Sequence, residues 1–115
     1  MYKRRSPIPR MAAPKRQPEG MIVYECLRWL LDQGYYVWRN ATGACKIGRR
    51  WMRFGFKGSG DIIGLTKTGH FLSVEVKSPK GRLRPEQAVF MARVNREGGK
   101  ALVARSVADL KEAGL

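Results

Sequence analysis

The sequence of 115 residues predicts an α+β fold of the α/β/α kind, a mixed β-sheet flanked by helices in the order α-β-β-β-α-β-α. Two observations lead to this prediction. Segments with apolar residues three and four positions apart, which indicate helices, alternate with short β-branched and aromatic runs, which indicate strands. Prolines and glycines separate these segments. A chain of this length forms one domain at most, with a single core between its layers.

Residues 1–18 are predicted to form a flexible basic arm, which leaves residues 19–115 as the folded domain. The arm holds four of the six prolines, six of the 23 lysines and arginines, and no acidic residue. A segment of this composition has little apolar surface to bury and is expected to stay loose.

The segment PEGMIVYECLRWLLDQG predicts the first helix, with Pro18 at its start and Gly34 at its end. Residues 35–40 are aromatic and β-branched and predict a strand. Residues 41–57 contain several glycines and many cations, so we expect a long loop there with one short strand at 51–56. The apolar face of the helix comprises Ile22, Val23, Cys26, Leu27, Leu30 and Leu31.

Two further strands are predicted at residues 61–66 and 71–78, joined as a hairpin by a turn that carries Gly69. After a break of proline and glycine, residues 84–99 predict the second helix, with a proline in its first turn. Residues 100–106 then predict a buried strand. Residues 107–114 predict a terminal helix with Ser106 as its N-cap.

The charge of the chain points to a polyanionic partner, because a formal net charge of +14 favours binding to phosphates. No acidic residue lies between Asp32 and Asp61, and aromatic residues are interleaved there with cations. Basic residues mixed with aromatics suit phosphate contacts together with base stacking. The expected DNA-binding cations of this stretch are Arg39, Lys46, Arg49, Arg50, Arg53 and Lys57.

The two cysteines, Cys26 and Cys45, have no second cysteine or histidine near them and do not form a zinc motif. No run of the sequence reaches the length of a membrane span, and no apolar signal core follows the basic N-terminus. We therefore expect an intracellular, cytoplasmic protein that binds no membrane.

Three charged residues lie inside apolar runs and are candidates for a catalytic metal site. Glu75 and Lys77 lie two positions apart on a predicted strand and share a face, and Asp61 opens the neighbouring strand. Two carboxylates this close repel each other unless a cation lies between them, and Mg²⁺ prefers such ligands. The backbone carbonyl of Val76 could supply another oxygen, and Lys77 could orient or deprotonate a water. A metal ion beside an ammonium suits hydrolysis of a phosphodiester. An E-x-K triplet alone is more often a solvated strand face or a cross-strand ion pair, and the Gly-rich sequence before Asp61 and the basic charge of the chain favour the catalytic interpretation.

The runs "RNATGA", "RFGFKGSGDIIG", "VEVKSPKGRLRPEQ" and "GGKALVARSV" together resemble the PD-(D/E)xK nuclease superfamily, and within it the virus-type replication–repair nuclease (VRR-Nuc) family. The resemblance extends from about Glu19 to Asp109. It implies a restriction-endonuclease-like core and a DNA endonuclease that uses Mg²⁺ or Mn²⁺. It also implies action on branched DNA such as Holliday junctions, often as a homodimer, with no small-molecule substrate.

By this resemblance Asp61 is the motif aspartate, Glu75 and Lys77 are the (D/E)xK pair, and Gln87 is the glutamine at the start of the following helix. Glu19 matches the glutamate of the first helix, which can complete the metal site; Glu25 is the alternative. The sequence has a valine one turn later, where the family often has a glutamine. The residues expected to meet DNA near the site are Arg39, Asn40, Lys80, Arg82 and Arg84.

Two alternative functions fit the same charge. A non-catalytic nucleic-acid-binding protein would use the cations but would give no role to Asp61 and Glu75, which repel phosphates when no metal masks them. A sequence-specific, restriction-type endonuclease would use the same site. A chain this small has no room for a separate sequence-reading domain, which favours cutting directed by DNA shape.

Overall fold

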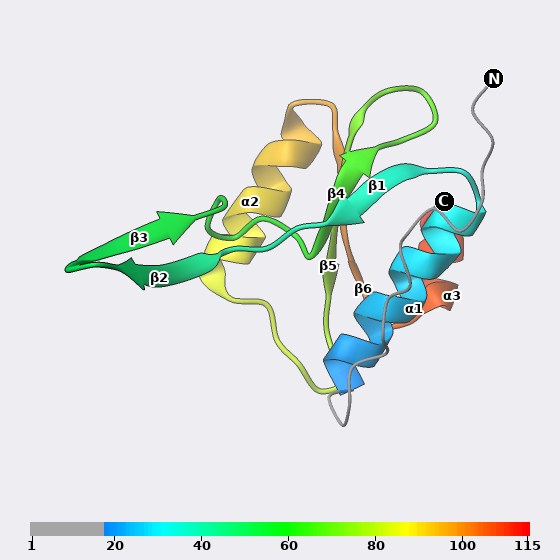
Figure 1. The fold of residues 1–115 in the computed structure, drawn as a ribbon. Helices are drawn as coiled ribbons and strands as arrows, with labels where there is room; N and C mark the ends of the chain where they lie inside the picture. Colours follow the sequence, from blue (N-terminus) through cyan, green and yellow to red (C-terminus); the bar gives the residue numbers. More distant parts are fainter. Residues whose placement is uncertain (1–17) are drawn as a thin grey trace, which may run out of the picture.

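The computed structural model describes residues 18–115 and confirms the α+β class, with a mixed sheet between helices (Figure 1). The predicted basic arm lies outside the described residues, except for Pro18, which begins the first helix. The helices are α1 (Pro18–Asp32), α2 (Pro85–Arg96) and α3 (Val107–Glu112). The strands are β1 (Tyr36–Arg39), β2 (Gly43–Ile47), β3 (Arg50–Phe54), β4 (Ile62–Leu65), β5 (Phe71–Val76) and β6 (Lys100–Ala104).

The main sheet has the strand order β1-β4-β5-β6. Strand β4 is antiparallel to both β1 and β5, whereas β6 is parallel to β5. The parallel pair requires a crossover, and α2 supplies it. Figure 1 shows α1 and α3 on one face of the sheet and α2 on the other. The predicted hairpin of β4 and β5 and the predicted second helix are both confirmed.

The core lies between α1 and the sheet. The apolar stripe of α1 packs against alternate residues of the two central strands, which point to this face. The largest fully buried side chains there include Leu27, Leu30, Ile62, Leu72 and Val74. Because Leu72, Val74 and Val76 fill the α1 face of β5, the residues between them, Ser73 and Glu75, must point to the opposite face.

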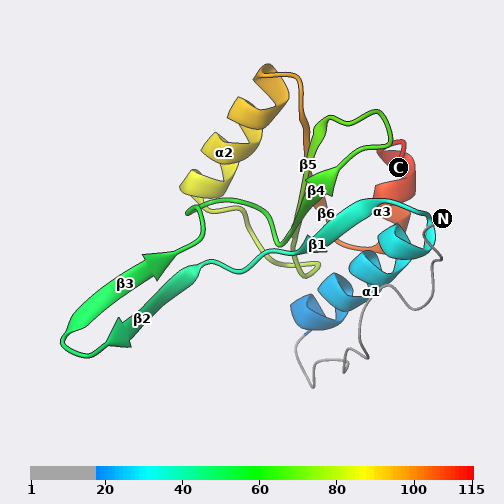
Figure 2. The same ribbon diagram turned by 45° about the horizontal axis from the view of Figure 1, so that its top comes forward.

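Residues 41–57 form a second β-structure. The short strand expected at 51–56 is present as β3, but the loop expected before it was wrong, because residues 43–47 form β2. Strands β2 and β3 form an antiparallel ribbon outside the main sheet, closed by a two-residue turn at Gly48 and Arg49. Gly48 has a φ of 61°, which the tight turn requires and glycine adopts at low cost. Both strands are exposed along their whole length, so neither packs a face on the core. Figure 2 shows this hairpin extending away from the rest of the domain.

Ser106 occupies the N-cap of α3 as predicted, but its side chain makes no capping hydrogen bond. The carboxylate of Asp109 instead accepts a hydrogen bond from the backbone N–H of Arg105, at 2.8 Å. None of the helices within residues 18–115 is long and apolar enough to cross a bilayer.

Candidate active site

The structure brings the five residues with predicted catalytic roles to a single pocket of about 250 Å³. Asp61, Glu75, Lys77, Gln87 and Glu19 all line it, although they come from four separate parts of the chain. The remaining lining residues are Thr42, Gly58, Ser59, Arg82 and Arg84. The pocket therefore combines carboxylates with cations, as a site for a metal ion and a phosphate would.

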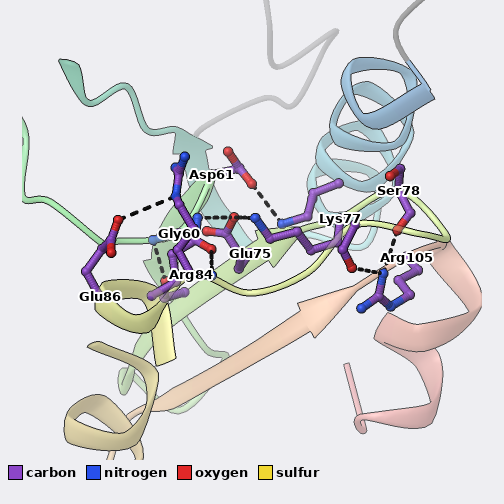
Figure 3. Close-up of polar contacts among 12 residues, drawn as sticks. Gly60, Asp61, Glu75, Lys77, Ser78, Arg84, Glu86 and Arg105 are labelled. Carbon is purple, nitrogen blue, oxygen red and sulfur yellow. Dashed lines mark hydrogen bonds and ion pairs between the residues drawn. The ribbon is translucent and has the colours of Figure 1, made fainter. Parts of the chain in front are cut away.

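Strand pairing places the two central carboxylates side by side. The register pairs Ile62 with Val74, so one residue further along Asp61 lies opposite Glu75 on the same face of the sheet. Oδ2 of Asp61 accepts a hydrogen bond from the backbone N–H of Val76 at 2.8 Å, which fixes the orientation of the carboxylate. Figure 3 shows Asp61, Glu75 and Lys77 gathered at this point.

Glu75 is buried, with only 4% of its surface exposed, and two side chains donate to it. Its Oε2 lies 3.2 Å from the ammonium of Lys77 and 2.9 Å from Nε2 of Gln87. The amide oxygen of Gln87 accepts from the backbone N–H of Arg84 at 2.9 Å, so both ends of this amide are engaged. Gln87 is thereby locked between the start of α2 and the acidic pair, and it is not a solvated helix residue.

Burial raises the pKa of Glu75 to about 7, from an ordinary value of 4.5. The negative charge of Asp61 raises this pKa further, Lys77 opposes the rise through its hydrogen bond and its charge, and Glu19 adds a smaller increase. The pocket thus holds more negative charge than Lys77 alone can balance, and a bound cation would relieve the repulsion.

The donor set fits a hard divalent cation. Within residues 18–115, no three acidic, histidine or cysteine side chains converge tightly enough to form a metal cluster by themselves. Mg²⁺ needs only one or two carboxylates, because water and substrate oxygens fill the rest of its octahedron. The N–H of Val76 points to Asp61, and in an extended strand the carbonyl of the same residue points to the same edge. Asp61, Glu75 and this carbonyl are compatible with such an ion.

Of the two glutamates on α1, only Glu19 lines the pocket. It lies in the first turn of the helix with an exposed side chain, whereas Glu25 is exposed elsewhere on α1. Val23, at the position where a glutamine was expected from the resemblance, is buried in the core. The geometry therefore favours Glu19 over Glu25 as the additional carboxylate.

Asn40, predicted to contact DNA, has its side chain committed within the protein. Its Nδ2 donates to Oγ of Ser59 at 2.7 Å and to the carbonyl of Gly60 at 2.9 Å, and its backbone N–H donates to the carbonyl of Asp61 at 2.7 Å. These bonds attach the loop that leads into β4 to the end of β1. Asn40 therefore fixes the backbone of Gly60 and Asp61.

Two supporting residues were missed in the sequence. Ser73 is buried and accepts a hydrogen bond from the backbone N–H of Gly60 at 3.1 Å; its place two residues before Glu75 on the same strand face was the available signal. The guanidinium of Arg105 donates to the carbonyls of Ser78 at 2.5 Å and Gly81 at 2.9 Å, as Figure 3 shows for Ser78. Arg105 follows β6, whose end lies beside the end of the parallel β5.

The predicted DNA-binding cations lie in two groups, one at the pocket or on the connection beside it and the other on or next to the hairpin. Arg82 and Arg84 line the pocket directly, and Lys80 is exposed on the same connection between β5 and α2. Arg39 ends β1, and the remaining cations are exposed on the hairpin or just after it. Among residues 18–115, no carboxylate pairs with any of these hairpin cations, which are Lys46, Arg49, Arg50, Arg53 and Lys57.

Comparison with known proteins agrees with this geometry. Residues 18–108 match the model of the VRR-NUC domain. Neither the curated proteins nor the solved structures contain a significant match. The family match covers most of the chain and includes every residue of the pocket, and a VRR-NUC domain indicates a nuclease of the PD-(D/E)xK type. The chain therefore belongs to the VRR-NUC family.

Proposed function

We propose that the protein is a divalent-metal-dependent DNA endonuclease that cuts branched DNA, such as a Holliday junction. The observation that carries this proposal is the pairing of Asp61 with the buried Glu75 in a pocket that also holds Lys77 and is bordered by arginines. An acidic pair in a basic protein has no use in plain phosphate binding, because it repels the ligand. It becomes useful when a cation links it to a phosphate.

Asp61, Glu75 and the carbonyl of Val76 would hold Mg²⁺ or Mn²⁺, and Glu19 would add an outer oxygen. When bound, such an ion would supply Lewis-acid polarisation of the phosphate and a more acidic water. The hydrogen bond from the N–H of Val76 keeps one oxygen of Asp61 occupied, so the other oxygen is left for the pocket. The donors Lys77 and Gln87 both reach Oε2 of Glu75, which leaves its Oε1 for the same purpose.

Lys77 would act on the substrate. Its side chain is almost fully buried, with the ammonium beside Glu75, so its position is set by the protein and not by solvent. Once a cation shares the charge of Glu75, the ammonium can orient a water or donate to a phosphate oxygen in the transition state. Gln87 lies at the start of α2, where backbone N–H groups favour an anion, and would help to position that phosphate.

The cations would place the DNA without reading its bases. Arg82 and Arg84 flank the pocket, and the hairpin cations extend the basic surface away from it. Contacts to phosphates fix the register and orientation of DNA but carry no sequence information. This supports selection by DNA shape over restriction-type specificity.

We further propose a homodimer. An open groove of about 1120 Å³ runs beside α2, and its lining includes Phe56, Phe71, Val89 and Phe90. Phe56 and Val89 are 70% and 68% exposed, and exposed apolar surfaces of this kind are often contacts between proteins. A two-fold dimer would present two pockets to the paired strands of a junction. Sedimentation equilibrium should give twice the chain mass, and a monomer at all concentrations would contradict this part of the proposal.

The test of the activity is a panel of a four-way junction, a flap, a fork and a linear duplex, each with Mg²⁺, Mn²⁺ or EDTA. Wild-type protein should cut the branched DNAs only when metal is present, and Lys77→Ala should lose cutting while it keeps binding. Lys111→Ala, on α3, removes the same charge outside the pocket and serves as the matched control. Binding of all four DNAs without metal-dependent cutting would identify a non-catalytic binding protein, and a ladder of discrete fragments from long duplex would indicate restriction-type cutting.

A further inference from the structure

The β2–β3 hairpin has two faces of different chemistry. Residues directly opposite each other in an antiparallel pair share a face, and successive residues alternate between faces. The register pairs Lys46 with Trp51 and Ala44 with Arg53, so these four side chains lie together. The opposite face is mainly apolar and comprises Cys45, Ile47, Arg50, Met52 and Phe54. A Cβ built on Gly43 would fall 2.9 Å from the ring of Phe54, which places that ring on the apolar face, as the register requires.

The face of Lys46, Trp51 and Arg53 suits nucleic acid. The ring of Trp51 is 71% exposed and has a cation opposite it and another two residues further along its strand. No acidic residue lies on either strand or in the turn. An aromatic ring between cations is the arrangement with which proteins stack an unpaired base while they bind the neighbouring phosphates.

The same face leads to the catalytic pocket. Thr42 lines the pocket and directly precedes β2. It is two residues before Ala44 and four before Lys46, the spacing of residues on one face of a strand. Trp51 lies opposite Lys46, four residues beyond Thr42. At a rise of about 3.3 Å per residue, the indole is roughly 13 Å from the edge of the pocket. This distance corresponds to about four nucleotides of a stacked DNA strand, at about 3.4 Å each.

We propose that Trp51, on this face of the hairpin, stacks on an unpaired base at a branch point, about four nucleotides from the cut. The inference rests on the proposed function and specifies its substrate. In a continuous duplex every base is stacked on both sides, and the indole can reach a base face only after a base pair opens. At a branch point the indole replaces a stacking partner that the DNA has already lost. Lys46 and Arg53 bind phosphates of either DNA equally well.

The test measures binding in EDTA by fluorescence anisotropy, with a labelled four-way junction and a linear duplex of matched sequence. Trp51→Ala should weaken junction binding about tenfold and duplex binding less than twofold, and Trp51→Phe should keep most of the preference. Lys46→Ala should weaken binding of both DNAs to the same extent and lower the slope of log Kd against log salt by about one. Met52→Ala, next to Trp51 on the opposite face, is the matched control and should change neither.

A second measurement locates the stacked base. 2-Aminopurine placed at successive positions of one junction strand should show its largest fluorescence change about four nucleotides from the cut, and this change should be absent with Trp51→Ala. Three results would overturn the inference. Trp51→Ala could lose as much affinity for duplex as for junction, Met52→Ala could lose as much junction affinity as Trp51→Ala, or the wild type could fail to bind the junction. Because binding is measured without metal, absence of cutting would refute the nuclease proposal and the spacing from the cut, but not the stacking of Trp51 at a branch point. A junction preference that survives Trp51→Ala would refute the stacking alone.

Discussion

Glu75→Gln should stabilise the metal-free protein at alkaline pH, because the pocket holds a carboxylate that is costly to ionise. The folded protein binds a proton on Glu75 up to about pH 7, whereas the unfolded chain releases it near pH 4.5. Between these values the unfolded state binds fewer protons, so the stability of the wild type falls as the pH rises. The pKa difference corresponds to a loss of roughly 3 kcal/mol that is complete above about pH 8.

Glutamine has nearly the same shape as the protonated glutamate and does not ionise. The two proteins should therefore be equally stable near pH 4.5, and the variant should be more stable by up to about 3 kcal/mol at pH 8. The assay is urea unfolding in EDTA at several pH values, followed by circular dichroism. Taking the difference between the two proteins removes the contribution of titrating groups that do not interact with Glu75. Curves that stay parallel from pH 4.5 to 8 would refute the view that Glu75 is strained by burial and by Asp61.

Three other predictions concern the pocket, the turn after β5 and the two cysteines. Gly60→Ala should destabilise the protein by about 2 kcal/mol or more and abolish cutting, because the new Cβ would fall 2.8 Å from the carbonyl oxygen of Val74. An unchanged melting temperature in thermal unfolding would contradict this. Arg105→Ala should lower cutting several-fold and stability by roughly 1–3 kcal/mol, because the turn after β5 loses its donor; wild-type turnover in the variant would refute this role. Burial raises the pKa of the Cys26 thiol to about 12, and the charges of Glu25 and Asp109 add to the rise. A thiol reagent at pH 8 should therefore label only the exposed Cys45 in the folded protein. Modification of both cysteines at equal rates would be inconsistent with the fold.

The sequence was sufficient to predict the parts of the fold that a buried face determines. The helix of residues 18–32 and the strand of residues 71–76 carry apolar residues at the helical and strand periods, because each packs one face on the core. Glu75 and Lys77 were predictable for the opposite reason, since charges inside an apolar strand require partners. The family resemblance then added Gln87 and Glu19, and both lie at the pocket.

The hairpin could not be predicted in this way, because neither of its faces packs on the core. Its strands contain the same exposed cations and aromatics that a loop would contain. No buried residues mark where β2 ends and β3 begins on either side of the turn at Gly48. The internal contacts of Asn40 could not be predicted for a related reason. A polar residue at the end of a strand can hydrogen-bond either DNA or a neighbouring loop. The amide of Asn40 bonds within the protein because the fold brings Ser59 and Gly60 next to it.

The most direct test of the account is isothermal titration of Mn²⁺ into the protein bound to an uncleavable, phosphorothioate-substituted junction. Wild-type protein should bind the ion, whereas Asp61→Asn and Glu75→Gln should bind it at least tenfold more weakly and Lys111→Ala should match the wild type. Absence of binding by the wild type, or equal binding by the two carboxylate variants, would contradict the claim that this acidic pair holds the catalytic ion.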